Sequence, residues 1–477
     1  MQRKISDIGF YFLVVAAIYL FAITAYRAST LSMTHDESGT YMFFIQENVM
    51  DYFINKDLWR SANNHLLNTV AMQWSVKAFG QSDLTVRLPN VLACLVYLLS
   101  LLGIIRTCFK RWEVQLLAFC LLALNPFVND FFSLARGYGM SVGFQLMALY
   151  QFILFFKKKA SIHLVLAYLA LGLASLSLFT NLLFIPAYTA ALWLVYLLDK
   201  ESYAELKLEI FTTPIIAAVA IGILVYVPIT ALSHLDEFKW GAKSLFKTNV
   251  NLANDSLYGK KYLGGDTKDI LSVILAATVL IGALTSVFWK ELKQVYENHK
   301  SYLFVSLAFL FLIIGMMSAY VILEGKYPDG RKSTMLIPLM GLIITYFFDS
   351  ISWRHFRYVI LIVVFMLVYH FFSAFEMSQV KEWWYDRSTK EFVSVIHKDA
   401  QGRDVVIGTH WMFHPTATYY LRTRGYDNMK MQSYSKKLHT DRVYDYFIST
   451  GSDWKYLEKN YEKIMTDRHG MLVLKKK

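Results

Sequence analysis

"IHLVLAYLALGLASLSLFTNLLFIPAYTAALWLVYLL", residues 162–198, is a nearly continuous apolar run. An α-helix rises about 1.5 Å per residue and the hydrocarbon core of a bilayer is about 30 Å thick, so one crossing needs roughly 20 apolar residues. This run is far too long for one crossing. We therefore predict two membrane-spanning helices, 162–179 and 181–198, separated by a break at Thr180-Asn181.

The composition of the whole chain is that of a membrane protein. Of its 477 residues, 56% are hydrophobic and only 18% are charged, whereas soluble domains carry about a quarter charged residues. The formal charge of +12 reports first on topology in such a chain and second on contacts with lipid phosphates, so it does not indicate nucleic-acid binding. The cysteines show neither zinc spacing nor a disulfide framework.

The same length rule finds eleven apolar segments, and we predict that each spans the membrane. They are 8–26, 88–105, 114–129, 138–156, 162–179, 181–198, 211–233, 270–289, 302–323, 333–348 and 358–375. With a cytoplasmic N-terminus, the short inward segments 106–111, 157–159, 290–300 and 352–357 all carry Lys or Arg, which is the positive-inside pattern. The long outward loop 234–269 is also basic, and this leaves the opposite orientation open.

Three non-membrane pieces then face outward: a first loop, about 27–87, with its own helical pattern, the loop 234–269, and a tail, 376–477. In the tail, 404–409, 444–450 and 470–477 have the pattern of strands, and 416–425 and 454–465 that of helices. We predict a mainly α polytopic protein with a transmembrane domain over 1–375 and a small extracytoplasmic α/β domain over 376–477.

Ionisable and polar residues gather at the outward ends of the spans. Asp36 and Glu37 follow the first span. The other polar and ionisable residues of this group lie later in the first loop or next to other spans: Asn64, His65, Arg87, Asp130, Arg136, Arg331 and Lys332. Ionisable residues at membrane level are costly and indicate a functional site. The pattern favours a cavity at the outer membrane face, with a carboxylate for acid/base chemistry and guanidiniums for an anionic group.

Each residue also has a purely structural interpretation. Thr34-x-x-Glu37 fits a capping box, which would leave Asp36 in the first helical turn. Arg87 and Arg136 could snorkel to the interface, Arg331 could belong to a turn and His65 to an ordinary loop. His410 and His414 have the spacing of a helical metal pair, but no third ligand is evident.

As a set, these stretches resemble the GT-C superfamily of integral-membrane glycosyltransferases. The matching pieces are "HDE" after the first span, "NNHLLNT", "FGQSDLTVRLPNVL", "NPFVNDFFSLARGYGM" and, late in the chain, "GRKSTMLIPL". The protein O-mannosyltransferase and aminoarabinose-transferase type is the most similar. The resemblance implies a sugar donor linked to polyprenyl phosphate, an acceptor outside the cytoplasm, and transfer with inversion. It also implies a bacterial inner (plasma) membrane.

The resemblance also implies roles for individual residues. Asp36 matches the catalytic aspartate of the first loop, and Glu37 the second member of the acidic pair. His65 matches the histidine of a His-x-Pro-Leu motif, although Leu66 and Leu67 follow it here. Arg136 and Arg331 match the basic residues associated with the lipid phosphate.

The chemistry of inverting transfer agrees with these roles. A base must take the proton of the attacking hydroxyl or amine, and cations must stabilise the departing phosphate. We assign Asp36 as the base. Arg136 and Arg331, with help from Lys326 or Lys332, would hold the donor phosphate, and Asn64, His65 and Tyr138 would contact substrate. No metal or other cofactor is required, and a divalent ion at Asp36 and Glu37 stays an open alternative.

Two other functions fit part of the pattern. A flippase or transporter of lipid-linked or anionic substrates would explain the spans and the basic residues, but it predicts inverted repeats and broken helices at mid-membrane, and no matching halves are found. An O-antigen ligase or polymerase would concentrate its basic residues in a large late loop. The sequence identifies neither the sugar nor the acceptor, which could be a lipid, a glycan or a protein.

Overall fold

Apolar helices make up most of the chain. The structure, a computed structural model, describes residues 2–59, 61, 63–258, 264–289, 296–322, 324–353, 355–440 and 442–477. Parts of the predicted segments 290–300, 352–357 and 234–269 lie outside the described residues. The chain divides into two units: Met1–Ala25, Asn48–Val70 and Pro89–Phe375 form the first, and Tyr26–Glu47, Ala71–Leu88 and Glu376–Lys477 form the second. The second unit therefore takes two segments of the predicted first loop, 27–87, in addition to the tail.

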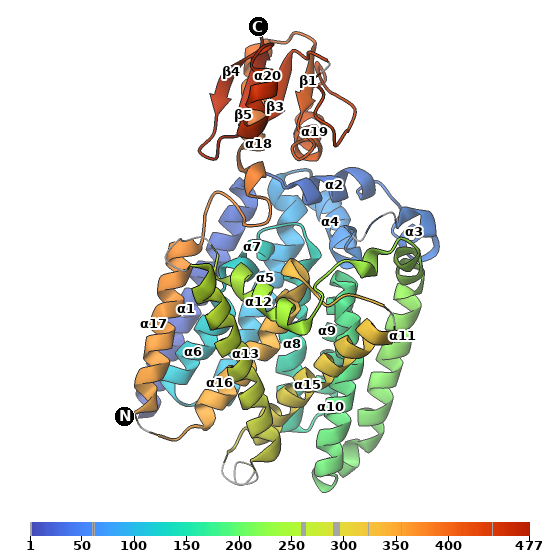
Figure 1. The fold of residues 1–477 in the computed structure, drawn as a ribbon. Helices are drawn as coiled ribbons and strands as arrows, with labels where there is room; N and C mark the ends of the chain where they lie inside the picture. The colour runs from blue at the N-terminus through green and yellow to red at the C-terminus, as the bar shows by residue number, and fades with distance from the viewer. Residues whose placement is uncertain are drawn as a thin grey trace. The chain divides into compact units, whose positions relative to one another are not determined.

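The helices up to residue 375 follow the apolar pattern, with short 3-10 helices (η) between some of them (Figure 1). In chain order they are α1 Gln2–Thr30, α2 His35–Phe44, α3 Asp51–Ile54, η1 Lys56–Leu58, α4 Leu66–Phe79, α5 Asp83–Cys108, α6 Trp112–Ala123, α7 Pro126–Phe132, α8 Gly137–Lys158, α9 Ser161–Ser177, η2 Phe179–Leu183, α10 Phe184–Leu198, η3 Glu201–Leu206, α11 Lys207–His234, η4 Glu237–Lys239, α12 Leu245–Ser256, α13 Gly265–Phe288, α15 His299–Ile322, η5 Gly330–Leu336, α16 Ile337–Ser350 and α17 Phe356–Ala374.

Nine helical stretches among the described residues are long and apolar enough to cross a membrane. They contain α1, α5, α8, α10, α11, α13, α15, α16 and α17. The pair α6 and α7 qualifies as a tenth, and α9 is apolar but shorter. All eleven predicted segments thus coincide with apolar helices, while the number that cross the membrane stays a prediction.

The long run 162–198 is broken where the sequence predicts. Helix α9 ends at Ser177, and η2 lies between it and α10. Asn181 stabilises the break, because its side-chain amide donates to Ser141 Oγ at 2.6 Å and to the carbonyl of Ala174 at 3.1 Å.

The predicted span 114–129 consists of two apolar helices with a bend between them. Helices α6 and α7 meet at an angle of 58°. Asn125 starts α7 as its N-cap, with its side chain accepting from the N–H groups of Phe127 and Val128. Pro126 follows at the first helical position, which its fixed φ suits, whereas it could not continue α6.

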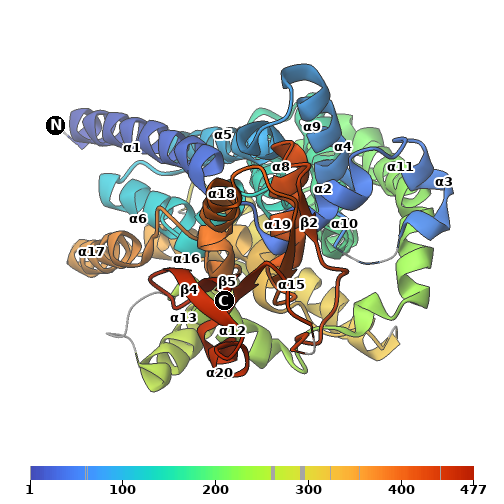
Figure 2. The ribbon, with the colours of Figure 1, turned by 90° about the horizontal axis from the view of Figure 1, so that it is seen from above.

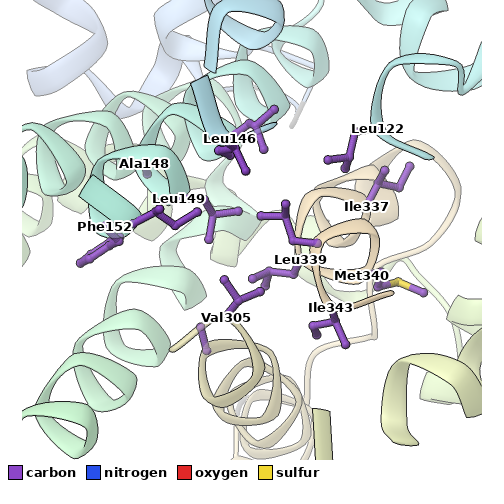
Figure 3. Close-up of a cluster of buried hydrophobic side chains, with 14 of the residues drawn as sticks. Leu122, Leu146, Ala148, Leu149, Phe152, Val305, Ile337, Leu339, Met340 and Ile343 are labelled. Carbon is purple, nitrogen blue, oxygen red and sulfur yellow. The ribbon is translucent and has the colours of Figure 1, made fainter. Parts of the chain in front are cut away.

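The core of the first unit lies among α6, α8, α15 and α16. Figure 3 shows its side chains converging from these helices: Leu122, Leu146, Ala148, Leu149, Phe152, Val305, Ile337, Leu339, Met340 and Ile343. Around it, α17 lies beside α6, and α11 beside α9 (Figures 1 and 2). Apolar packing on both sides fixes α8, and α8 begins at residues predicted to bind substrate.

The tail in the second unit forms a small α/β domain with a five-stranded sheet in the order β2-β1-β3-β5-β4. Its elements are η6 Trp384–Ser388, α18 Thr389–Ala400, β1 Val405–Thr409, α19 His414–Thr423, β2 Met429–Met431, β3 Tyr446–Ser449, η7 Gly451–Asp453, α20 Trp454–Leu457, β4 Tyr461–Thr466 and β5 Leu472–Lys476. Strand β1 pairs parallel with β2 and β3, in register Val405–Met429 and Ile407–Tyr446, and β5 pairs antiparallel with β3 and β4. Helix α2 packs on α19 in this unit.

The three strands and the helix 416–425 predicted in the tail are confirmed by β1, β3, β5 and α19. The predicted helix 454–465 is wrong in its second half. Helix α20 ends at Leu457, and Tyr461–Thr466 is strand β4. Pairing with β5 decides the conformation of this stretch, because a partner strand overrides a local helix preference.

Candidate functional site

Helix α2 of the second unit begins with the predicted capping box. Thr34 Oγ1 accepts from the N–H of Glu37 at 3.4 Å, and Glu37 Oε2 accepts from the N–H of Thr34 at 2.9 Å. These bonds satisfy two donors that a helix start otherwise leaves unpaired. Asp36 therefore lies in the first turn, where the helix dipole favours an anion.

Glu37 also forms a buried ion pair with Arg87. Both side chains are 0% exposed, and Arg87 Nε and Nη2 donate to Glu37 Oε1 and Oε2, each at 2.8 Å. The same guanidinium donates to the carbonyls of Ala28, Leu31 and Ser32 where α1 ends. The snorkelling interpretation of Arg87 is thus wrong: this arginine satisfies carbonyls at the end of α1 and just after it, and it holds Glu37.

Residues of the tail hold the chain on either side of this cap. Tyr420 Oη accepts from the N–H of Met33 at 2.7 Å, and Asp386 Oδ2 accepts from the N–H of His35 at 2.7 Å. His35 Nδ1 lies 2.9 Å from the carbonyl of Met412. Burial raises the pKa of Asp386 well above its usual value. The backbone that carries Asp36 is therefore fixed by the tail.

In the first unit, Tyr138 gathers three of the predicted site residues. The guanidinium carbons of Arg136 and Arg331 lie 5.8 and 5.6 Å from the centre of its ring. The His65 ring packs against it edge-on, with 4.8 Å between the ring centres. Both contacts with arginine have cation–π geometry. Two positive charges and an imidazole thus surround one aromatic ring.

The start of α8 positions Arg136 and Tyr138. Arg136 is the N-cap residue of α8, it is buried, and its Nη1 donates to the carbonyl of Asn63 at 2.9 Å, so it does not snorkel. Gly137 follows because nothing larger fits. A Cβ there would stand 2.0 Å from the carbonyl oxygen of Ser177 and 2.8 Å from the His65 side chain.

The turn before η5 positions Arg331. Asp329 Oδ1 accepts from the N–H of Gly330 at 2.9 Å and from Asn251 Nδ2 at 2.6 Å. Gly330 has φ +52°, a conformation that L side chains rarely adopt. Lys332 Nζ lies 3.4 Å from the carbonyl of Trp240. Lys326 is exposed, with its ammonium over the ring of Tyr320, so the described structure does not gather it with Arg331.

His65 and Asn64 line a small pocket next to Tyr138, together with Leu66, Leu176, Ser177, Leu178, Phe179, Thr180, Leu232, Glu237 and Lys332. His65 is 5% exposed and Asn64 is 2% exposed, so His65 is not an ordinary exposed loop residue. Burial, and then the positive charges of Arg136, Arg331 and Lys332, hold the pKa of His65 well below its usual value. The imidazole is therefore neutral.

The described residues contain no group of three or more His, Cys, Asp or Glu side chains arranged to hold a metal ion. His410 lies before α19 begins, and His414 Nε2 lies 2.7 Å from the carbonyl of Gln432. The two histidines thus do not form a pair on one helix.

The sequence predicts Tyr138, His65, Asn64, Arg136 and Arg331 as site residues, and the structure places them together. It does not predict Thr180 and Ser177 in the pocket wall, nor the tail residues that hold α2. Hydroxyl residues inside an apolar run give no signal of their own. The contacts of the tail join segments more than 350 residues apart in sequence, which no local pattern reveals.

The chain is similar to known proteins in part of its sequence and in its fold. Residues 68–231 match the family described as dolichyl-phosphate-mannose-protein mannosyltransferase. No curated protein sequence matches the chain. The fold is similar to that of ArnT from Cupriavidus metallidurans in the apo state, with TM-score 0.52, 11% identity and 97% of each chain covered. The same protein bound to undecaprenyl phosphate gives TM-score 0.54 and 10% identity, again with 97% of each chain covered.

The resemblance stated from the sequence is thus confirmed. The family match covers part of the N-terminal half, and the likeness in fold extends over nearly the whole length. Together they confirm the mainly helical fold with a small C-terminal region of strands. This chain is therefore a polytopic membrane protein whose fold is similar to that of ArnT and whose residues 68–231 match the dolichyl-phosphate-mannose-protein mannosyltransferase family.

Proposed function

We propose that this protein is an inverting glycosyltransferase that moves a sugar from a polyprenyl-phosphate carrier to an acceptor outside the cytoplasm. The observation that carries the proposal is the pair of guanidiniums, Arg136 and Arg331, held at the ring of Tyr138. The ArnT structure with bound undecaprenyl phosphate supports the class of lipid.

The two arginines suit a departing lipid phosphate. A guanidinium is planar and can donate to two phosphate oxygens at once. Arg136 also precedes the first turn of α8, where the helix dipole favours an anion. Because the leaving phosphate is already anionic, it needs charge stabilisation more than a general acid. Lys332, which lines the neighbouring pocket, adds to this positive charge.

We assign Asp36 as the base that takes the proton of the attacking hydroxyl or amine. Its support is the resemblance of "HDE" to the first-loop motif and the cap that fixes this turn. Glu37 has both side-chain oxygens bound, to Arg87 and to the backbone N–H of Thr34. Its role in this proposal is to hold α2 rather than to react.

Mass spectrometry of envelope glycans and lipids, from cells with and without the protein, tests the function. We expect one sugar to disappear from one class of molecule, and that change identifies both donor sugar and acceptor. Unchanged glycans together with an altered distribution of the lipid carrier would indicate transport and contradict the proposal.

The Asp36→Asn variant tests the base. Without a carboxylate to accept the proton, transfer should fall by about 10²–10⁴-fold, the usual contribution of general base catalysis. Binding of undecaprenyl phosphate should be retained, because the amide keeps the size of the side chain. The measurement is transfer by the purified protein in nanodiscs, with lipid binding as its control. An Asp36→Asn protein that transfers sugar at the wild-type rate would end this assignment.

A further inference from the structure

The pocket next to Tyr138 has a volume of about 60 Å³, which is room for about four water-sized groups. Its walls come from the residues before α4, from η2 and the end of α9, and from the start of α8. The lining mixes apolar residues, among them four leucines, with residues that carry polar or charged side chains. Such a pocket suits one edge of a small polar ligand that also carries C–H surface.

The tautomer of His65 follows from its one hydrogen bond. His65 Nδ1 lies 3.1 Å from the carbonyl oxygen of Ser177, and a carbonyl can only accept. Nδ1 therefore carries the proton. In a neutral imidazole the other nitrogen is then a bare acceptor. His65 Nε2 is buried and has no hydrogen-bond partner among the described residues.

The surrounding charges keep this nitrogen unprotonated. Arg136, Arg331 and Lys332 oppose a positive charge on His65, as does burial, while Glu237 is the one acidic residue in the described lining. A protonated Nε2 would add a further cation to this group. His65 thus offers an acceptor and not a donor.

Two further lining residues also have a buried polar atom that lacks a partner in the described part of the chain: Asn64 Nδ2 and Thr180 Oγ1. Thr69 Oγ1 donates to Asn64 Oδ1 at 2.7 Å, which orients the amide and leaves Nδ2 as a donor. Buried polar groups are nearly always bonded in native proteins. Three unbonded ones on residues that line one pocket therefore point to a ligand.

A ligand group that satisfies these atoms must both donate and accept. A hydroxyl does so, because it can donate to His65 Nε2 and accept from Asn64 Nδ2. A phosphate oxygen of a diester has no proton to donate, so it cannot satisfy Nε2. The pocket therefore differs in chemistry from the arginines beside it.

We propose that this pocket binds a hydroxyl-bearing edge of the sugar on the lipid donor, with His65 Nε2 as acceptor and Asn64 Nδ2 and Thr180 Oγ1 completing the site. This inference rests on the proposed function. The donor sugar is chosen over the acceptor because Tyr138 contacts both His65 and the two arginines. In the donor, the sugar is attached directly to the phosphate that those arginines hold.

The test compares sugar-carrying and bare lipids on the full protein in nanodiscs. The probes are undecaprenyl phosphate and undecaprenyl phosphates that carry glucose, mannose or 4-amino-4-deoxyarabinose. His65→Asn keeps a donor for the Ser177 carbonyl and loses the acceptor, whereas His65→Gln places an amide oxygen near the Nε2 position. Thr180→Val removes a hydroxyl from the lining. Thr278→Val is its matched control, since Thr278 is also half-buried, does not line the pocket, and donates its Oγ1 to a carbonyl of its own helix.

We expect the wild type to bind one of the sugar lipids more tightly than undecaprenyl phosphate. His65→Asn should weaken the binding of that sugar lipid about five- to tenfold, the usual effect of one lost hydrogen bond. The affinity for undecaprenyl phosphate should change by less than twofold. His65→Gln should recover most of the loss. Thr180→Val should weaken the binding of the sugar lipid only, and Thr278→Val should change the binding of neither lipid. Unfolding temperatures of all variants separate local effects from loss of the fold.

A pH series gives a second readout. The phosphodiester of a sugar lipid keeps its charge between about pH 5.5 and 8, so we expect flat affinity for wild type over this range. Affinity that rises as the pH falls would mean that an imidazolium binds phosphate, and this overturns the inference. An equal loss of affinity for both lipids in His65→Asn also overturns the inference, as does a loss of affinity for the acceptor alone. A wild type that binds none of the lipids refutes the proposed function and the inference together.

Discussion

The start of α2 and the pocket beside Tyr138 carry the residues of the proposed mechanism, and they differ in how far their polar groups are bound. Around α2, the N–H groups of Met33, Thr34 and His35 all have side-chain partners, and Glu37 has both oxygens engaged. In the pocket, three buried polar atoms have no partner among the described residues. A buried polar atom left unbonded costs about 1–3 kcal/mol.

The difference separates two tasks. A reacting carboxylate needs a fixed backbone, since small errors of position lower the rate steeply, and the bonded cap of α2 supplies one. A binding pocket needs groups that a ligand can complete, and these are costly until it arrives. Changes to the side chains that hold α2 should therefore act mainly on stability, and changes around Tyr138 mainly on binding.

Glu37→Gln should have the largest effect on stability. It leaves the Arg87 guanidinium fully buried without its carboxylate, and breaking such a pair costs about 3–5 kcal/mol. The measurement is chemical unfolding of the purified protein. Its control is Asp7→Asn, because the Asp7–Arg106 pair is partly exposed and exposed pairs contribute about 0–1 kcal/mol. Wild-type stability in Glu37→Gln would show that the pair does not hold α2.

Arg331→Gln should act in the opposite way. Arg331 is only half-buried and lies over the Tyr138 ring, so its loss should change the unfolding temperature little. Binding of undecaprenyl phosphate should weaken about tenfold or more, since hydrogen bonds to charged groups contribute about 1.5–3 kcal/mol. Arg357→Gln is the matched control, because Arg357 also lies over a tyrosine ring in the same unit. Equal binding by both variants would remove Arg331 from the phosphate site.

The fold could be predicted wherever the membrane imposes a length. Lipid requires long apolar helices with internally bonded backbones, so the run 162–198 and its break were readable from length alone. The bend between α6 and α7 could not be predicted from length, because Asn125 caps one helix inside an otherwise apolar stretch. Strand β4 was missed for another reason. Its partner β5 is a separate stretch of chain, and local propensity says nothing about pairing.

The site was predictable to the extent that its residues are costly in a membrane. Arg136, Arg331 and His65 stand out because charged and polar groups at span ends need a reason. The role of Arg87 could not be predicted, because its partner Glu37 and the carbonyls that it binds are about 50 residues away in the sequence. Thr180 gave no signal, since a threonine in an apolar run is ordinary.

The smallest expected effect concerns the tail residue that holds α2. Burial raises the pKa of Asp386, so folded Asp386 keeps its proton at pH values where the unfolded chain, with a pKa of about 4, has lost it. Unfolding then releases a proton, and this carboxyl lowers stability as the pH rises above about 4. Asp386→Asn keeps an acceptor for the N–H of His35 and cannot ionise. Its unfolding temperature should fall less than that of the wild type between about pH 5 and 8.

Asp399→Asn is the control, because hydrogen bonds from Tyr446 and Lys475 lower the pKa of Asp399 and its stabilisation is lost only below that range. Identical pH dependence in wild type and Asp386→Asn would show that Asp386 is ionised in the fold, and the tail would then hold α2 through a charged carboxylate.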